Sequence, residues 1–227
     1  MTTPIYCFNS SSLKSTDMFL MISALNTMLP AFCAAWSLKQ YYCVAAPANM
    51  NPGTSGMFCV FLDNTDAANN LAYHTESSNI PFAKVFVKTI LQYNGAILMG
   101  ANNTVPTVAQ AFSHEVFEMI CNQNINVWWQ MSNGTLVPAE VTDPVQGDVV
   151  PVMVGSIKVG MSDYVLPAWC DSQATKGPYN FLNTLTKPFQ VAKGGYMITM
   201  KNSAMNYVLG ASATPYVQYV AESDSKE

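Results

Sequence analysis

One short segment of the chain combines residue types that bind metal ions with the spacing that a helix requires. His114 and Glu118 are four residues apart, and positions i and i+4 of an α-helix lie on one face about a turn apart. Zinc accepts both an imidazole nitrogen and a carboxylate oxygen as ligands. The pattern is the H-E-x-x-H arrangement with a carboxylate in place of the second imidazole. We therefore expect His114 and Glu118 to hold one metal ion, with zinc as the expected cofactor.

Glu115 directly follows the first expected ligand. In motifs of this kind, that carboxylate reaches a water molecule on the metal. Three protein ligands leave a fourth zinc position open for the water, and zinc lowers the pKa of the water to about 7. We expect Glu115 to act as the general base toward this water.

A third ligand has to come from a separate element of the chain. The best candidates are Glu140 and Asp143, which can supply a ligand and a supporting carboxylate, and the sequence leaves open which does which. Asp148 is a weaker third candidate. His74 is the only other histidine, and it can bind metal, stabilise a reaction intermediate as a catalytic residue, or simply hold its loop together.

The short motif also has a simpler interpretation, because H-E-x-x-E occurs by chance. In that case the segment is a partly buried helix whose two glutamates lie on a solvated edge. Three features favour the metal site. One of only two histidines falls here, the apolar residues Val116, Phe117 and Ile120 would embed the helix in a core, and acids are scarce in this chain.

Two segments have the apolar spacing of helices and would frame this site. The central helix should use Thr104 as its cap and Pro106 in its first turn, where a missing N–H costs nothing. An earlier helix is expected over residues 18–29, with a cap in Ser15-Thr16-Asp17 and an end or kink at Pro30.

The remaining patterns predict strands in mixed order with the helices, which is typical of an α+β domain with a mixed sheet around a central metal-binding helix. We expect a single domain over residues 16–205, an N-terminal arm or edge strand over residues 1–15, and a C-terminal tail over residues 206–227. Strands are expected over residues 37–46, 57–62 and 80–87, from residue 139 onward, in a hairpin of 149–154 with 157–161, and in a hairpin of 189–200 around Gly194-Gly195.

The composition restricts the classes of partner. Hydrophobic residues make up 50% of the 227 residues, charged residues only 11%, and the net charge is -4. Because no basic patch occurs, we expect no nucleic-acid partner. No run approaches the roughly 18 apolar residues that a membrane span requires, and no basic leader precedes an apolar segment. We expect an intracellular or particle-associated protein whose six cysteines are free, buried thiols.

The scarcity of charge has two interpretations of equal weight. A free monomer keeps a charged surface, so a chain rich in Asn, Thr and Ser instead fits an assembly with itself or with other proteins, such as a virion. The alternative is that an Asn- and Thr-rich composition is typical of proteins from the same source.

The motif segments resemble a largely uncharacterised family of zinc-metallopeptidase-like proteins with the pattern S-H-E-x-x-E-M and, downstream, E-x-x-D-P-V. The resemblance covers residues 18–200. Its segments here are Ser113-His114-Glu115-Val116-Phe117-Glu118-Met119, Glu140-Val141-Thr142-Asp143-Pro144-Val145, Phe61-Leu62-Asp63-Asn64, Ala72-Tyr73-His74, Pro81-Phe82-Ala83-Lys84-Val85-Phe86, Ser162-Asp163-Tyr164-Val165-Leu166-Pro167-Ala168-Trp169, Pro188-Phe189 and Gly194-Gly195-Tyr196.

The resemblance implies a metallopeptidase-like fold and a metal held by His114, Glu118 and one acid of the Glu140 and Asp143 pair. It also implies Glu115 as the base and Tyr164 as a catalytic candidate directed toward the site. One departure is visible: relatives follow the helix with an Asp-Pro step, where this chain has Cys121-Asn122-Gln123.

Two functions follow from these observations. The first is a zinc-dependent hydrolase of the peptidase type, with a peptide as substrate and Glu115 as general base. The second is a structural or assembly protein, for example a virion component, on an inherited metallopeptidase-like fold.

Overall fold

The computed structural model describes residues 2–47, 49–51, 56–67, 70–102 and 105–211. These residues form a mixed α+β structure, as the sequence predicted. The elements in chain order are β1 (Thr3–Ser10), α1 (Ser15–Ala35), β2 (Tyr41–Ala45), β3 (Phe58–Leu62), β4 (Ala72–Ser77), β5 (Ile80–Phe86), α2 (Val87–Gln92), α3 (Val108–Cys121), β6 (Trp128–Gln130), β7 (Leu136–Pro138), η2 (Asp143–Val145), β8 (Val149–Val154), β9 (Ile157–Ser162), η3 (Pro167–Trp169), β10 (Tyr196–Lys201) and β11 (Ala204–Leu209).

The largest unit is a five-stranded mixed sheet in the order β2-β1-β3-β5-β4. Strands β2, β1, β3 and β5 run parallel, and β4 pairs antiparallel with β5 at one edge. The expected arm or edge strand at the N-terminus is wrong, because β1 lies inside the sheet between β2 and β3. Its alternating residues Ile5 and Cys7 are buried, and this apolar face is what fixes the strand in the interior.

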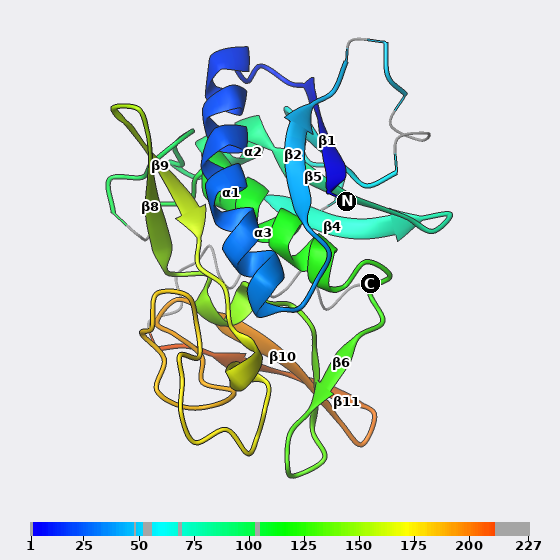
Figure 1. Cartoon of the computed structure of the whole chain (residues 1–227), viewed down its shortest axis with the longest axis vertical. Coiled ribbons are helices and arrows are strands. Elements are labelled where there is room, and N and C mark those ends of the chain that lie inside the picture. The colour runs from blue at the N-terminus through cyan, green and yellow to red at the C-terminus, as the bar shows by residue number, and fades with distance from the viewer. Residues whose placement is uncertain (1, 48, 52–55, 68–69, 103–104, 212–227) are drawn as a thin grey trace.

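Both long helices lie beside this sheet (Figure 1), with α1 against β2 and α3 against β4 and β5. Helix α1 is longer than expected and continues through Pro30, because Phe32 and Cys33 extend its buried face beyond the proline. Its N-cap is Lys14, with no side-chain hydrogen bond, in place of the expected Ser15-Thr16-Asp17 cap. By length and composition, α1 is the one described helix that could cross a membrane, and half of its apolar window is buried in the protein.

Helix α3 is the centre of the molecule. Every residue from Val108 to Ile120 is buried, because β4 and β5 cover one side of the helix and β9 covers another. The cap is Thr107, whose side chain accepts a hydrogen bond from the Gln110 N–H at 2.9 Å. The expected cap, Thr104, lies outside the described residues.

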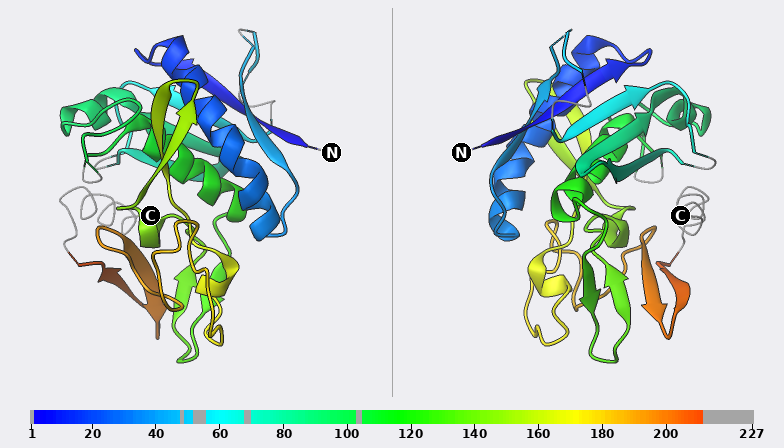
Figure 2. Two further views of the ribbon diagram at one scale, coloured as in Figure 1. Left: turned by 60° about the vertical axis from the view of Figure 1, so that its left-hand side comes forward. Right: turned by 90° about the vertical axis from the view of Figure 1, so that its right-hand side faces the viewer.

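A second layer lies beyond the first sheet along the longest axis of the molecule (Figure 2). It contains a four-stranded sheet in the order β11-β10-β7-β6 and the loops around η3. The final hairpin turns at Asn202-Ser203 and not at the expected Gly194-Gly195, and β11 enters the segment expected to be a tail. The strand expected from residue 139 is replaced by β7, which ends at Pro138, and by the η2 turn. The hairpin of β8 and β9 is confirmed.

The six cysteines are all free, as expected. Four of them are buried, whereas Cys121 and Cys170 are partly exposed. The core therefore needs no covalent cross-link, in keeping with a chain of this length.

Candidate metal centre

The helix motif and the η2 turn bring three metal-binding side chains together. His114 Nε2 lies 3.3 Å from Glu118 Oε2 and 3.1 Å from Asp143 Oδ1. Ligand atoms about 2.0–2.1 Å from a tetrahedral zinc are separated by about 3.3 Å, so both distances match such a site. His114, Glu118 and Asp143 therefore form a buried group that can hold a metal ion. Of the two acids that the sequence left open as third ligand, Asp143 is the one beside His114.

The two oxygens of Glu118 have different surroundings. Oε1 accepts hydrogen bonds from the Thr142 N–H at 3.1 Å, from the Thr142 hydroxyl and from the Asp143 N–H at 3.3 Å. Oε2 is then directed toward the two histidines. The η2 turn thus orients Glu118 as a ligand with one donor oxygen, which is the usual role of neighbours that surround a metal-binding carboxylate.

The second histidine reaches the same place from strand β4. His74 Nδ1 lies 3.2 Å from Glu115 Oε2 and 3.6 Å from Glu118 Oε2, and its Nε2 lies 3.5 Å from Glu140 Oε2. His74, Glu115 and Glu118 form a second group that can hold a metal ion and shares Glu118 with the first. The structure therefore assembles six ionisable side chains from α3, β4 and the segment around η2.

The charge of this cluster calls for a cation. Four carboxylates and two imidazoles have side chains only 4 to 14% exposed. If both imidazoles are neutral, the cluster carries four negative charges, and if both are protonated it still carries two. Burying uncompensated charge is costly, and a divalent cation among the oxygens and nitrogens reduces the imbalance by two charges. The donor set of nitrogen and oxygen atoms suits zinc.

The pKa values of the clustered histidines and of Glu118 reflect the same excess of negative charge. Burial lowers the pKa of His74, but the charge of Glu140 and the contact with Glu115 outweigh burial and raise it to about 10. Burial likewise lowers the pKa of His114, and the charge of Glu118 outweighs it and raises the pKa well above its ordinary value. For Glu118, burial raises the pKa, but His114 and His74 overcome this effect and lower it to about 2. The buried carboxylates thus favour positive charge beside them, either as protons on the two histidines or as a bound cation.

The end of α3 supports the cluster through Asn122, the residue that follows the last helical residue, Cys121. Asn122 Oδ1 accepts hydrogen bonds from the Asn126 N–H at 2.9 Å and the Val127 N–H at 3.0 Å. Asn122 Nδ2 donates to Glu140 Oε1 at 3.3 Å. The amide therefore closes the helix end and holds Glu140, which an aspartate cannot do as a donor.

A cavity of about 270 Å³ opens at the cluster. His74, His114, Glu115, Glu118, Glu140 and Asp143 form one end of its wall. The opposite wall comes from β10, β11 and the hairpin of β6 and β7, so the site lies between the two layers of the molecule.

Two expected candidates lie elsewhere. Tyr164 is 1% exposed and packs in the core, with its ring centroid 4.8 Å from that of Phe32 and 4.9 Å from that of Phe117. Asp148 accepts a hydrogen bond from the Thr184 hydroxyl at 3.2 Å, and neither it nor Tyr164 lines the cavity. The tyrosine is therefore a packing residue, and its aromatic neighbours account for its burial.

Comparison of the chain with protein-family models, with curated proteins and with solved structures finds no match. Sequence reasoning gave no role to Thr142, although a hydroxyl one residue before Asp143 is a visible signal for a side chain that orients a ligand.

Proposed function

We propose that this chain is a metal-dependent hydrolase of the peptidase type. Zinc is the proposed ion, with His114, Glu118 and Asp143 as ligands and Glu115 as general base. The proposal includes the metallopeptidase-like family that the motifs resemble. The observation that carries it is the distance from His114 Nε2 to the carboxylate oxygens of Glu118 and Asp143, which matches tetrahedral zinc inside a buried, acid-rich cluster.

A bound zinc ion supplies Lewis-acid chemistry, which polarises a carbonyl and lowers the pKa of water. The protein residues have separate tasks. Glu115 takes the proton of the attacking water and gives it to the leaving amine, the two proton transfers that amide hydrolysis needs. His74 holds Glu115 by the contact of Nδ1 with Oε2 at 3.2 Å, which fixes the base relative to the cavity. The low exposure of the cluster excludes bulk water.

The overlapping group of His74, Glu115 and Glu118 favours one rival function. If His74 joins the other ligands, four protein groups close the coordination and no position remains for substrate. A closed site of this kind is structural. The chain would then be an assembly component whose metal holds α3, β4 and η2 together.

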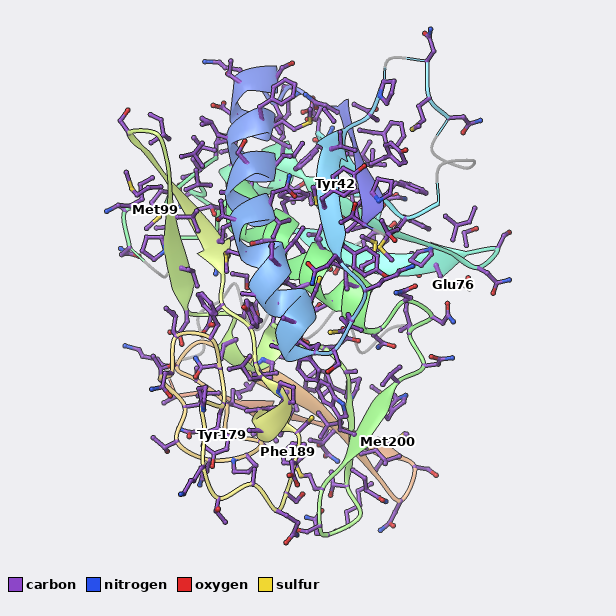
Figure 3. The ribbon with its side chains drawn as sticks, viewed as in Figure 1. Tyr42, Glu76, Met99, Tyr179, Phe189 and Met200 are labelled. Atoms are coloured by element: carbon purple, nitrogen blue, oxygen red, sulfur yellow. The ribbon has the colours of Figure 1, made fainter. Side chains whose placement is uncertain are left out.

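The deciding experiment is the zinc content of purified protein, with wild type beside Glu118→Ala. A matched control is Glu76→Ala, which removes a partly exposed glutamate near the end of β4 that lies away from the helices (Figure 3). We expect about one zinc per chain in wild type and control, and loss of zinc in Glu118→Ala. No zinc in wild type after supply at neutral pH would overturn the proposal.

A second variant separates hydrolase from structural site. Glu115→Gln removes the base but keeps the shape of the side chain, so it should retain zinc and lose peptide hydrolysis by about 100-fold or more. If His74→Ala loses zinc and the zinc-supplied wild type hydrolyses no peptide, His74 is the fourth ligand, and the structural interpretation replaces the hydrolase.

A further inference from the structure

The wall of the cavity opposite the ionisable cluster is apolar. Side chains on a strand alternate between faces, so Tyr196, Ile198 and Met200 of β10 share one face, and all three line the cavity. Met200 pairs with Met205 of β11, which continues the same face into the neighbouring strand. Figure 3 places Met200 in the second layer, where β10 crosses behind β6.

The hairpin of β6 and β7 completes this wall. Trp128 and Pro138 are cross-strand partners, and both line the cavity. Trp128 and Met205 are 38% and 48% exposed, so both present apolar surface at the cavity. The four-stranded sheet thus presents a continuous apolar surface to the metal-binding cluster.

The charges of the cavity are one-sided. Among the described residues that line it, four are acidic and none is Lys or Arg. A substrate group with negative charge therefore meets net repulsion, because the four carboxylates outnumber the two histidines, and this repulsion excludes it as effectively as attraction selects another. A free C-terminal carboxylate falls in the same excluded class.

The size of the cavity limits what enters. Its volume of about 270 Å³ lies just below the roughly 300–1,000 Å³ of pockets that enclose drug-sized ligands. It suits one side chain and the adjoining backbone better than a whole ligand. Met200 and Met205 are flexible and adapt to different shapes, so the wall fits several apolar side chains and not a single one.

We infer that the four-stranded sheet is the specificity surface of the site, and that the substrate is a peptide that places a large uncharged apolar side chain beside the scissile amide. The inference rests on the proposed hydrolase function. Leu, Met and Phe are accepted at this position, Asp and Glu are rejected, and the scissile bond lies within the peptide and not at its free C-terminus.

The test uses internally quenched peptides that differ at one position, Leu or Asp, with amidated C-termini and the zinc-supplied full chain. We expect kcat/KM to be at least about tenfold higher for the Leu peptide, because an apolar pocket discriminates by this order. Met200→Lys should lower kcat/KM for the Leu peptide by about tenfold and raise it for the Asp peptide. Met153→Lys, an exposed methionine on β8, is the matched control and should change neither.

A binding measurement separates failure of this inference from failure of the proposed function. Titration of zinc-supplied Glu115→Gln with the same two peptides should show tighter binding of the Leu peptide, whether or not wild type cleaves it. Cleavage without preference, or an unchanged ratio in Met200→Lys, overturns the inference and leaves the hydrolase intact. If the protein binds no zinc and cleaves no peptide, the proposed hydrolase function is overturned. If the two peptides also bind equally or not at all, the inferred specificity surface is overturned as well.

Discussion

Thr142 offers a direct test of how the site holds its metal. Its hydroxyl donates to Glu118 Oε1, while Oε2 of the same carboxylate lies beside His114 and His74. Thr142→Val keeps the shape of a fully buried side chain and the N–H that also donates to Oε1, and it removes only the hydroxyl. The carboxylate then rotates more freely and must be ordered when the metal binds.

The expected magnitude follows from two independent estimates. A hydrogen bond to a charged group contributes about 1.5–3 kcal/mol. Loss of a side chain that orients a metal ligand lowers metal affinity by about 10- to 100-fold, which corresponds to about 1.4–2.7 kcal/mol. The two ranges overlap, so we expect the zinc Kd of Thr142→Val to rise by about 10- to 100-fold.

The assay is competition for zinc against a chromophoric chelator of known affinity at constant pH and ionic strength. Thr142→Ser retains the hydroxyl and should stay near wild type. Thr199→Val is a matched control, because its hydroxyl donates to the Asn206 carbonyl at 3.3 Å and Thr199 does not line the cavity. If Thr142→Val binds zinc as tightly as wild type while Glu118→Ala does not bind it, the proposed orientation of Glu118 by the η2 turn is refuted.

Three further predictions concern the ligand choice, pH and the anchoring of α3. Asp143→Ala should lose zinc, whereas Glu140→Ala should keep it, and the reverse result would exchange their roles. Burial raises the pKa of Asp163 from 3.8 to about 6 against its hydrogen bonds, so its contribution to stability is complete below pH 3.8 and is lost as pH rises through 6. Roughly 3 kcal/mol of unfolding free energy should disappear over this range, and chemical denaturation should show a flatter profile in Asp163→Asn. The Ser113 hydroxyl accepts from the Ser162 N–H at 2.8 Å, so Ser113→Ala should cost about 1–3 kcal/mol, and an unchanged urea midpoint would contradict that bond.

The core of the site was predictable because it depends on local spacing. His114 and Glu118 are separated by one helical turn, and the apolar residues between them required a buried helix, so pattern alone located α3. The choice between Glu140 and Asp143 was not predictable. It depends on how the chain enters the η2 turn, where Asp143 follows Thr142 against Glu118, and no local pattern fixes that path.

His74 was named as a candidate from the sequence, but strand β4, which carries it to the cluster, was not predicted. The hairpin of β4 and β5 turns at Ser78 and Asn79, both with positive φ, and the hairpin of β10 and β11 turns at Asn202 and Ser203 in the same way. Such turns favour Asn and Gly. Neither turn was predicted, because neither contains glycine. Asn79 and Asn202 were the available signals.

The interior position of β1 has a consequence for how the chain is made. Strand β1 pairs in parallel with β2 and β3, so its first partner is complete only when residue 45 has been synthesised and its second only when residue 62 has been synthesised. Long-range parallel pairing of this kind slows folding and exposes apolar strands meanwhile. Deletion of Thr3–Ser10 would therefore not trim an arm but divide the sheet between β2 and β3.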